Sequence, residues 1–209
     1  MIFAVLPAGG HSTRMGRPKL ALPLGGRTLL EHVIAALRAA EIEHVLVVLG
    51  PHVAELAQAA GAHVHILPEA TPDMRATVED GLRWLEERFQ PKRDDCWLLV
   101  PADHPTLQVE VVRSLISARD THPQRSIFVP TYQAKRGHPT LLAWSHVPGI
   151  RSLPAGQGIN TYLRQQIDQT LEVAVDSAEI LLDLDTPEDY ERLLREWPLT
   201  QAAPVKRVT

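Results

Sequence analysis

Short apolar runs alternate with longer stretches of helical periodicity through the first half of the chain, and this alternation strongly limits the folds open to it. Such an order is typical of βαβ units. The strand-like runs are residues 2–6, 44–49, 63–67 and 96–100, and the helical patterns are 29–40, 53–60 and 77–88. The sequence therefore predicts an α/β protein with a Rossmann-like, doubly wound, mostly parallel sheet in three layers.

The second half of the chain continues the pattern less regularly. A helix near 109–118 and a strand at 126–130 precede a Pro- and Gly-containing segment, 131–158, which we interpret as a flap or insert. We then expect a helix at 160–169 capped by Asn160, a strand at 171–175, and a last helix that begins after Thr186 and ends at Pro198. One domain is thus expected at 1–197, with a loosely held tail at 198–209.

Charge and composition exclude several classes of protein. The 209 residues include 21 Lys and Arg against 25 Asp and Glu, a formal net charge of −4 with no run of like charge. This balance does not suit nucleic acid or an anionic membrane, and no apolar stretch approaches the length of a membrane span. The apolar opening lacks the basic flank of a signal peptide, and the single cysteine, Cys96, cannot form an intramolecular disulfide. We expect a cytoplasmic protein with small-molecule partners.

The loop directly after the first expected strand carries the pattern with the most chemistry. Ligands of open α/β sheets bind beyond the carboxyl ends of the strands, where this loop lies. Gly9 and Gly10 let the backbone approach a ligand closely, and the loop also offers Ser12, Arg14 and Lys19. Its N–H groups and cations suit a polyphosphate. The spacing differs from both G-x-G-x-x-G and Walker loops, and an ordinary βα turn is the alternative.

The same loop resembles a known family. Gly10-x-Ser12-x-Arg14-Met15-Gly16-x-x-Lys19 is similar to the signature of the MobA-like nucleotidyltransferases, especially their molybdenum cofactor cytidylyltransferase branch. Further motifs follow in the family's order at 22–26, 101–105, 136–139 and 182–190. The resemblance implies a fold of the nucleotide-diphospho-sugar transferase type. It also implies transfer of a nucleoside monophosphate from a nucleoside triphosphate to a phosphorylated acceptor, a molybdopterin-type cofactor, with release of pyrophosphate.

The resemblance also implies roles for residues and partners. It places catalytic Arg14 and Lys19 on the nucleotide phosphates and implies Mg²⁺ as the cofactor. It implies a molybdoenzyme or a maturation protein as a partner. The nucleotide-binding residues implied are Pro7, Ala8, Gly9, Gly10, Ser12, Arg14 and Lys19.

Two details of the sequence bear on which nucleotide base the protein binds, and they leave alternatives open. Pro7 and Gly9 depart from the cytidylyltransferase pattern, and Ala8-Gly9-Gly10 also resembles the guanylyltransferase branch. The two residues between Gly16 and Lys19 match the cytidylyltransferases instead, as does the element at 137–139, so CTP is favoured. The alternatives are GTP, a sugar-phosphate or polyol-phosphate acceptor, and a nucleotide sensor without catalysis.

Acidic residues near the expected strand ends are candidates for binding the metal. Asp103 follows the strand at 96–100, beside the phosphate loop, and Mg²⁺ usually takes one or two carboxylates with phosphate oxygens and water. It is the first expected ligand and a catalytic residue; alternatively it caps a helix that begins near Thr106. Asp183 is the second expected ligand, by similarity to nucleotidyltransferases. Asp185 directly precedes a helix cap, so we interpret it as support for the helix start.

His138 is the candidate for binding the acceptor. It lies between Gly137 and Pro139, next to Lys135 and Arg136, where an imidazole can contact an anion. The alternative is a turn at the entry of a strand. No pair among the ten histidines has a convincing zinc spacing, so zinc is not expected.

Overall fold

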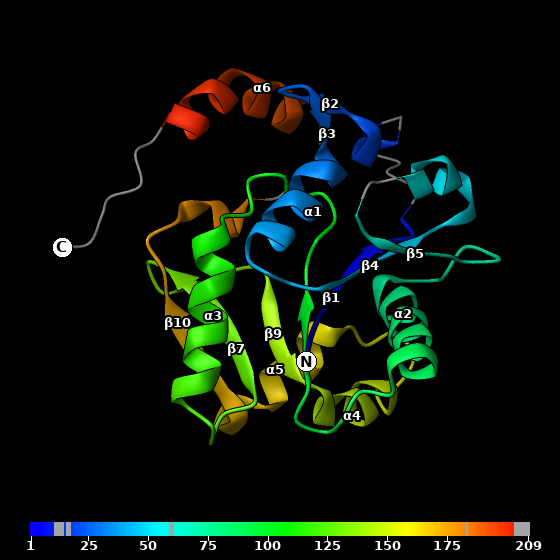
Figure 1. Cartoon of the computed structure of the whole chain (residues 1–209), viewed down its shortest axis with the longest axis vertical. Helices are drawn as coiled ribbons and strands as arrows, with labels where there is room; N and C mark the ends of the chain where they lie inside the picture. The colour runs from blue at the N-terminus through cyan, green and yellow to red at the C-terminus, as the bar shows by residue number, and fades with distance from the viewer. Residues whose placement is uncertain (11–14, 16–17, 59–60, 183, 203–209) are drawn as a thin grey trace.

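The computed structural model describes residues 1–10, 15, 18–58, 61–182 and 184–202. Their centre is an eight-stranded sheet in the order β10-β7-β9-β6-β1-β4-β5, with β8 beside β7 (Figure 1). The strands are β1 (Ile2–Ala8), β4 (His44–Leu49), β5 (His63–Ile66), β6 (Cys96–Leu99), β7 (Ile127–Tyr132), β8 (Lys135–Arg136), β9 (Thr140–Ala143) and β10 (Thr170–Ala174). A separate two-stranded sheet joins β2 (Pro23–Leu24) to β3 (Arg27–Thr28).

The large sheet is mostly parallel. β1 pairs in parallel with β4 and β6, β4 pairs in parallel with β5, and β7 with β10. β9 runs antiparallel to its neighbours β6 and β7, and β8 runs antiparallel to β7. The prediction of an α/β, doubly wound sheet is therefore confirmed, with one reversed strand between β6 and β7.

Helices cover both faces of the sheet. Ala4 and Leu6 of β1 are buried against α1 and α3, whereas Phe3 and Val5 are buried on the opposite face, against α2, α4 and α5. This alternation follows from the two-residue repeat of a strand. The α-helices are α1 (Leu29–Ala39), α2 (Met74–Phe89), α3 (Val109–Thr121), α4 (Val147–Arg151), α5 (Ile159–Gln165) and α6 (Pro187–Ala202). The 3₁₀ helices are η2 (Lys19–Ala21), η3 (Pro51–Gln58), η4 (Trp144–His146), η5 (Ile167–Gln169) and η6 (Ala178–Leu181). The molecule thus has three layers.

The last helix packs on the β2–β3 hairpin, at the top of Figure 1. A small apolar cluster joins them, with Leu24 and Leu29 on one side and Leu184, Tyr190 and Leu193 on the other. The Tyr190 hydroxyl donates a hydrogen bond to the carbonyl of Pro23. We call residues 184–202 the C-terminal arm. It packs against the first 32 residues of the chain, although it is the last part of the chain that the structure describes.

Helix α6 of the C-terminal arm begins where the sequence predicts it. The Thr186 hydroxyl accepts a hydrogen bond from the Asp189 N–H, and the Asp189 carboxylate accepts one from the Thr186 N–H. Pro187 is the first helical residue. However, the helix continues past Pro198 to Ala202, so the expected end at Pro198 was wrong. The proposed division into a domain at 1–197 and a tail remains a prediction.

Three other expectations are corrected by the structure. The helical pattern expected at 53–60 corresponds to the 3₁₀ helix η3 at residues 51–58, which is interrupted at Val53, where φ is −129°. Gly158, not Asn160, is the N-cap of α5, so Asn160 lies inside the helix. The segment 131–158 is not an insert as a whole, because it contributes β9 to the middle of the sheet. Leu141 and Leu142 of β9 are both fully buried, since helices cover both faces there.

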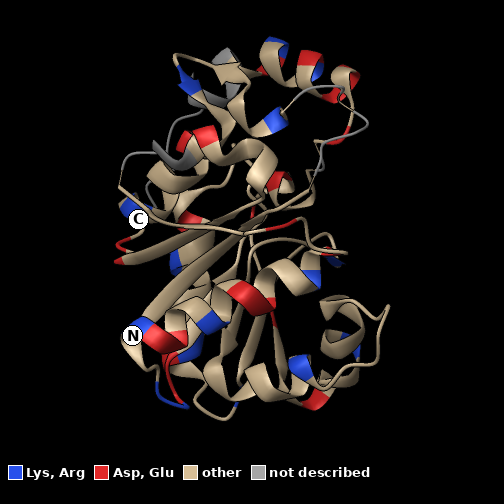
Figure 2. Ribbon diagram, turned by 90° about the vertical axis from the view of Figure 1, so that its right-hand side faces the viewer, with Lys and Arg blue, Asp and Glu red and all other residues tan. Residues whose placement is uncertain are grey.

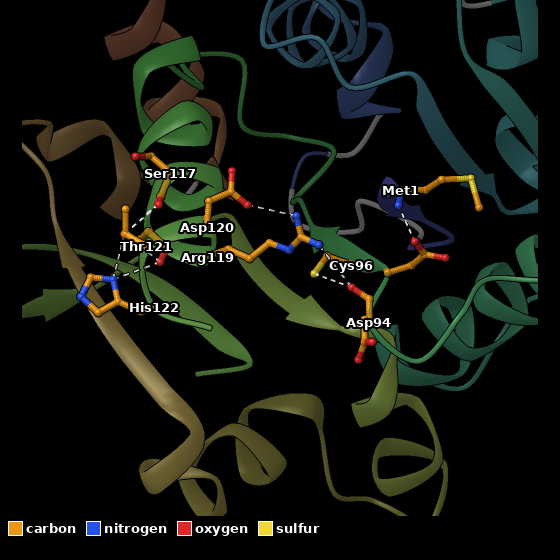
Figure 3. A network of polar contacts seen from close by, with 10 residues as sticks. Met1, Asp94, Cys96, Ser117, Arg119, Asp120, Thr121 and His122 are labelled. Atoms are coloured by element: carbon orange, nitrogen blue, oxygen red, sulfur yellow. Dashed lines mark hydrogen bonds and ion pairs between the residues drawn. The ribbon is translucent and has the colours of Figure 1, made fainter. Parts of the chain in front are cut away.

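Polar contacts link neighbouring segments of the chain at the amino-terminal ends of β1 and β6 (Figure 3). The Met1 ammonium is ion-paired with Asp95, and the Lys92 N–H donates a hydrogen bond of 2.7 Å to the same carboxylate. Arg119 donates from Nη2 to the Asp94 carbonyl. Burial raises the pKa of the neighbouring Cys96 thiol. A protonated, buried thiol is a poor nucleophile, so this end of the sheet offers no obvious chemistry.

Charges are distributed without an obvious single-sign face. In Figure 2 basic and acidic positions are interspersed over the described helices. Within the described parts of the chain, no helix combines the length and the apolar character that crossing a membrane requires.

Candidate functional site

A cavity of about 620 Å³ opens beyond the carboxyl ends of β1 and β6. These two strands are neighbours, but the chain leaves β1 toward β4 and leaves β6 toward β7, in opposite directions along the sheet. Such a reversal of strand order is where open α/β sheets bind ligands. The volume suits a small molecule, since ligand pockets usually measure roughly 300–1,000 Å³. The described lining comes from residues 7–10, 15, 19–20, 71–74, 77, 101–103 and 185.

One wall of the cavity is a close contact between the glycine loop and the start of α2. A Cβ atom placed on Gly9 would lie 2.8 Å from Thr77 Oγ1 and 3.3 Å from Thr71 Oγ1. These two hydroxyls lie 2.5 Å apart, so one of them donates a hydrogen bond to the other. Only glycine leaves the loop this close to the two threonines without displacing them.

The loop is also held from the end of β4. The Gly50 N–H donates a hydrogen bond of 3.3 Å to the Ala8 carbonyl. His52 Nε2 lies 3.1 Å from the Gly10 carbonyl oxygen. Because a carbonyl oxygen only accepts, Nε2 is the donor. Two residues of the loop are therefore fixed before the chain reaches the serine and arginine of the motif.

Lys19 brings two acidic residues together at the cavity. Its Nζ is ion-paired with the Asp103 carboxylate, lies 3.3 Å from Asp185 Oδ1, and donates a hydrogen bond of 2.9 Å to the Leu184 carbonyl. The lysine side chain is 16% exposed, that of Asp103 25% and that of Asp185 47%. The cluster is thus partly shielded from solvent, where salt screens charge interactions less than at an open surface.

Asp103 does not act as a helix cap. It lies in the turn after β6, whereas α3 begins at Val109 with Gln108 as its N-cap. The capping alternative is therefore wrong, and the described partner of the carboxylate is Lys19.

Asp185 is positioned by the start of the C-terminal arm. Its backbone N–H donates a hydrogen bond of 3.2 Å to Asp189 Oδ2. The Thr186 hydroxyl, followed by the backbone N–H groups of Thr186 and Asp185, holds the pKa of Asp189 below its usual value. The charged Asp189 carboxylate therefore holds the backbone of Asp185 in place. The Asp185 side chain faces Lys19.

Several of the predicted site residues line one cavity. Lys19 and Asp103 are in direct contact, and the predicted nucleotide-binding residues Pro7, Ala8, Gly9 and Gly10 line the same space. Three further predicted residues, Ser12, Arg14 and Asp183, lie outside the described residues.

His138 is not among the residues that line the cavity. Its backbone N–H donates a hydrogen bond of 2.9 Å to the Ile180 carbonyl. Its role in binding an acceptor stays a prediction.

The sequence interpretation missed the contribution of Asp185 and of the two threonines. The signal for Asp185 was the alternation Leu182-Asp183-Leu184-Asp185, in which Asp183 was preferred by similarity and Asp185 was interpreted as support for the helix start. Within the described residues, no three His, Cys, Asp or Glu side chains gather as a metal site. The described acidic residues that line the cavity are Asp73, Asp103 and Asp185; Asp73 caps α2, and Asp103 and Asp185 form the pair that contacts Lys19.

The chain is similar to a family model and to several known proteins. A family model described as the MobA-like NTP transferase domain matches residues 4–170. The purine catabolism protein PucB of Bacillus subtilis is 27% identical over 207 residues, which cover 93% of this chain and 96% of PucB. The molybdenum cofactor cytidylyltransferase of Escherichia coli is 28% identical over 192 residues, which cover 90% of this chain and 93% of that protein.

A solved structure shares the whole architecture. Rv0371c from Mycobacterium tuberculosis superposes with a TM-score of 0.78 at 26% identity, covering 93% of this chain and 98% of its own. The same protein in complex with manganese gives a TM-score of 0.74 at 25% identity, covering 93% of this chain and 97% of its own.

Proposed function

Because the chain belongs to the MobA-like NTP transferase family and is thus a nucleotidyltransferase, we propose that it transfers CMP from CTP to a molybdopterin-type phosphorylated acceptor. The reaction forms a bond between an acceptor phosphate oxygen and the α-phosphorus of CTP. The bond from that phosphorus to the leaving pyrophosphate breaks. The proposal includes a requirement for Mg²⁺.

The single observation that carries the proposal is the position of Lys19 between Asp103 and Asp185 at the glycine-loop cavity. The site presents a cation for phosphates, two carboxylates for a metal and a backbone with space for a nucleotide. Nucleotidyl transfer needs mainly positioning and charge stabilisation, because the acceptor already carries its attacking oxygen.

The donor set fits a hard divalent cation. Asp103 and Asp185 offer carboxylate oxygens, and Mg²⁺ commonly binds one or two carboxylates together with substrate phosphates and water. When bound, such a cation neutralises charge on the triphosphate and on the leaving pyrophosphate. Asp183 stays a predicted ligand. The manganese complex of Rv0371c supports a divalent cation in a protein of this architecture.

The chain's own residues bind and orient the nucleotide. The loop backbone at Gly9 and Gly10 is proposed to lie against the triphosphate, and Lys19 and Arg14 are proposed to contact its phosphates. Gly9 fits closely against Thr71 and Thr77, so the wall of the nucleotide site is set by steric fit. His138 is proposed to contact the anionic acceptor, and a molybdoenzyme or a maturation protein is proposed to receive the product.

The choice of cytosine and of a molybdopterin rests on the motif around Lys19 and on the cytidylyltransferase among the relatives. The Ala8-Gly9-Gly10 sequence favours GTP as a second candidate. Sugar-phosphate and polyol-phosphate acceptors share the same transfer chemistry.

A matrix of nucleotides against acceptors tests the proposal. The purified protein is offered CTP, GTP, ATP and UTP, each with a molybdopterin-type, a sugar-phosphate and a polyol-phosphate acceptor, and pyrophosphate is measured. We expect release with CTP and the molybdopterin, dependent on added Mg²⁺, and strongly reduced in Lys19→Ala and Arg14→Ala proteins that fold normally. Release with another pair reassigns the substrates. Nucleotide binding without release from any pair would support a sensor.

A further inference from the structure

Lys19 occupies the carboxylates that a divalent cation would use. Its Nζ contacts Asp103, Asp185 and the Leu184 carbonyl, so its three N–H donors have three acceptors. We propose that the Lys19 ammonium and a divalent cation compete for Asp103 and Asp185, so that the metal binds tightly only when a triphosphate draws Lys19 away. This inference rests on the proposed function, because that function identifies the two bound species as a divalent cation and a nucleoside triphosphate.

The competition follows from charge and space. An ammonium in direct contact with a carboxylate stands where a metal ion would coordinate that oxygen. A divalent cation beside it would also be repelled by a like charge in a partly shielded site. A metal ion that binds alone must therefore break the ion pairs of Lys19 and leave its ammonium without these partners. When a triphosphate binds as well, its oxygens can pair with Lys19 in place of the carboxylates.

The structure also provides for the release of Lys19. The residue begins η2, and its carbonyl accepts a hydrogen bond of 3.0 Å from the Leu22 N–H, which holds the backbone in place. The side chain is a flexible four-carbon stem with a compact charge at its end. Nζ can therefore move from the carboxylates to phosphate oxygens without a change in the fold. Lys19 lines the same cavity as Gly9 and Gly10, against which the phosphates are proposed to lie.

The consequence is a coupling between the two ligands. A triphosphate that removes Lys19 strengthens metal binding, and by linkage the metal strengthens triphosphate binding by the same factor. The lysine thus makes metal binding at the site depend on the nucleotide.

The test measures the binding of Mn²⁺ alone, with no nucleotide or acceptor present. Lys19→Met keeps the length of the side chain and removes its charge, so we expect it to bind Mn²⁺ about tenfold more tightly than the unchanged protein, within the usual range of coupling between sites. Lys19→Arg keeps a positive charge and should stay close to the unchanged protein. The matched control is Lys92→Met, an exposed lysine at the opposite end of the sheet, which should change nothing.

Two further measurements separate the outcomes. Adding Asp103→Asn to Lys19→Met should abolish the gain in Mn²⁺ affinity. A non-hydrolysable CTP analogue should increase Mn²⁺ affinity by a larger factor in the unchanged protein than in Lys19→Met. Equal Mn²⁺ affinity of Lys19→Met and the unchanged protein would overturn the proposal, as would a gain that survives Asp103→Asn. A failed pyrophosphate assay would reject the proposed function without altering the measurements on Mn²⁺ alone.

Discussion

His104 donates a hydrogen bond of 2.7 Å from Nε2 to the carbonyl oxygen of Glu179, which lies 75 residues later in the chain. The histidine is 2% exposed and directly follows Asp103. Glu179 belongs to η6, from which the chain leads to Asp185. One partly buried hydrogen bond therefore ties together the two segments that carry the carboxylates facing Lys19.

Replacing His104 should weaken the proposed metal site as well as the fold. His104→Leu leaves the Glu179 carbonyl without this donor, at a cost of about 1–3 kcal/mol in stability, and lets the segment before the C-terminal arm shift. We expect the Mg²⁺ concentration for half-maximal rate to rise severalfold, with partial recovery in His104→Gln, which keeps a donor. His122→Leu, at the end of α3, is the control. A Mg²⁺ requirement equal to that of the control would show that His104 only stabilises the fold.

Gly9→Ala should damage the proposed nucleotide site through steric overlap. The new Cβ would lie 2.8 Å from Thr77 Oγ1, and overpacking of this kind costs about 1–3 kcal/mol. We expect a lower unfolding temperature and a higher KM for the nucleotide. Gly10→Ala is the steric control, because no described atom lies within 4 Å of its added Cβ, so its unfolding temperature should not change.

A second substitution checks the cause of this effect. Thr77→Ala removes both Thr77 atoms that approach the added carbon, so the double variant Gly9→Ala/Thr77→Ala should recover part of the lost stability. Additive losses would contradict the steric explanation.

Asp103→Asn should separate charge from shape. Asparagine preserves the shape of the side chain but removes the negative charge that pairs with Lys19 and that a hard cation needs. We expect a folded protein with most of its activity lost, and some activity restored at high Mg²⁺ or with Mn²⁺. Asp94→Asn, exposed at the far end of the sheet, is the control. Turnover and a metal requirement like those of the unchanged protein would remove Asp103 from the catalytic centre.

The stability of the protein should fall below neutral pH because of His146. The residue is buried, with Nδ1 2.9 Å from the Tyr162 hydroxyl and Nε2 2.8 Å from the Ser126 hydroxyl. Burial lowers its pKa in the folded state. As pH falls below about 6.5, the unfolded chain therefore binds a proton first, and the free energy of unfolding decreases.

Urea unfolding between pH 8 and pH 5.5 measures this contribution. His146→Gln should be less stable at pH 8 and show a smaller loss of stability toward pH 5.5, whereas the control His122→Gln should keep the full loss. The reduction is expected to be partial, because burial, and then the nearby charge of His44, also lowers the pKa of His63. An unchanged slope in His146→Gln would contradict the assignment.

The layers of the fold could be predicted because their signals are local. Short continuous apolar runs predict the strands β1, β4 and β6, and Thr186 predicts the start of the last helix. The position of β9 could not be predicted in this way. A run of four residues carries little periodicity, and its place between β6 and β7 depends on pairing with strands distant in sequence.

The site could be predicted only where its residues directly follow a strand that the sequence reveals. The glycine loop and Asp103 each follow a recognisable strand, so their place at the sheet edge follows from the topology. The contact of Asp185 with Lys19 arises from the packing of the C-terminal arm on the β2–β3 hairpin, which no local pattern encodes. The fit of Gly9 against Thr71 and Thr77 is likewise a tertiary contact.

The packing of the C-terminal arm also bears on how the protein is made. Lys19 and Asp185 are 166 residues apart in the chain, and Tyr190 and Pro23 are 167 apart. At a synthesis rate of about 5–20 residues per second, the ribosome needs roughly 8–33 seconds to pass from the lysine to the aspartate. Throughout that time the nascent polypeptide lacks one of its two carboxylates and the helix that holds it. With the proposed role of Asp185 in binding the metal, transfer activity should appear only after translation has passed the arm, and unfinished chains should not consume nucleotide while they are still on the ribosome.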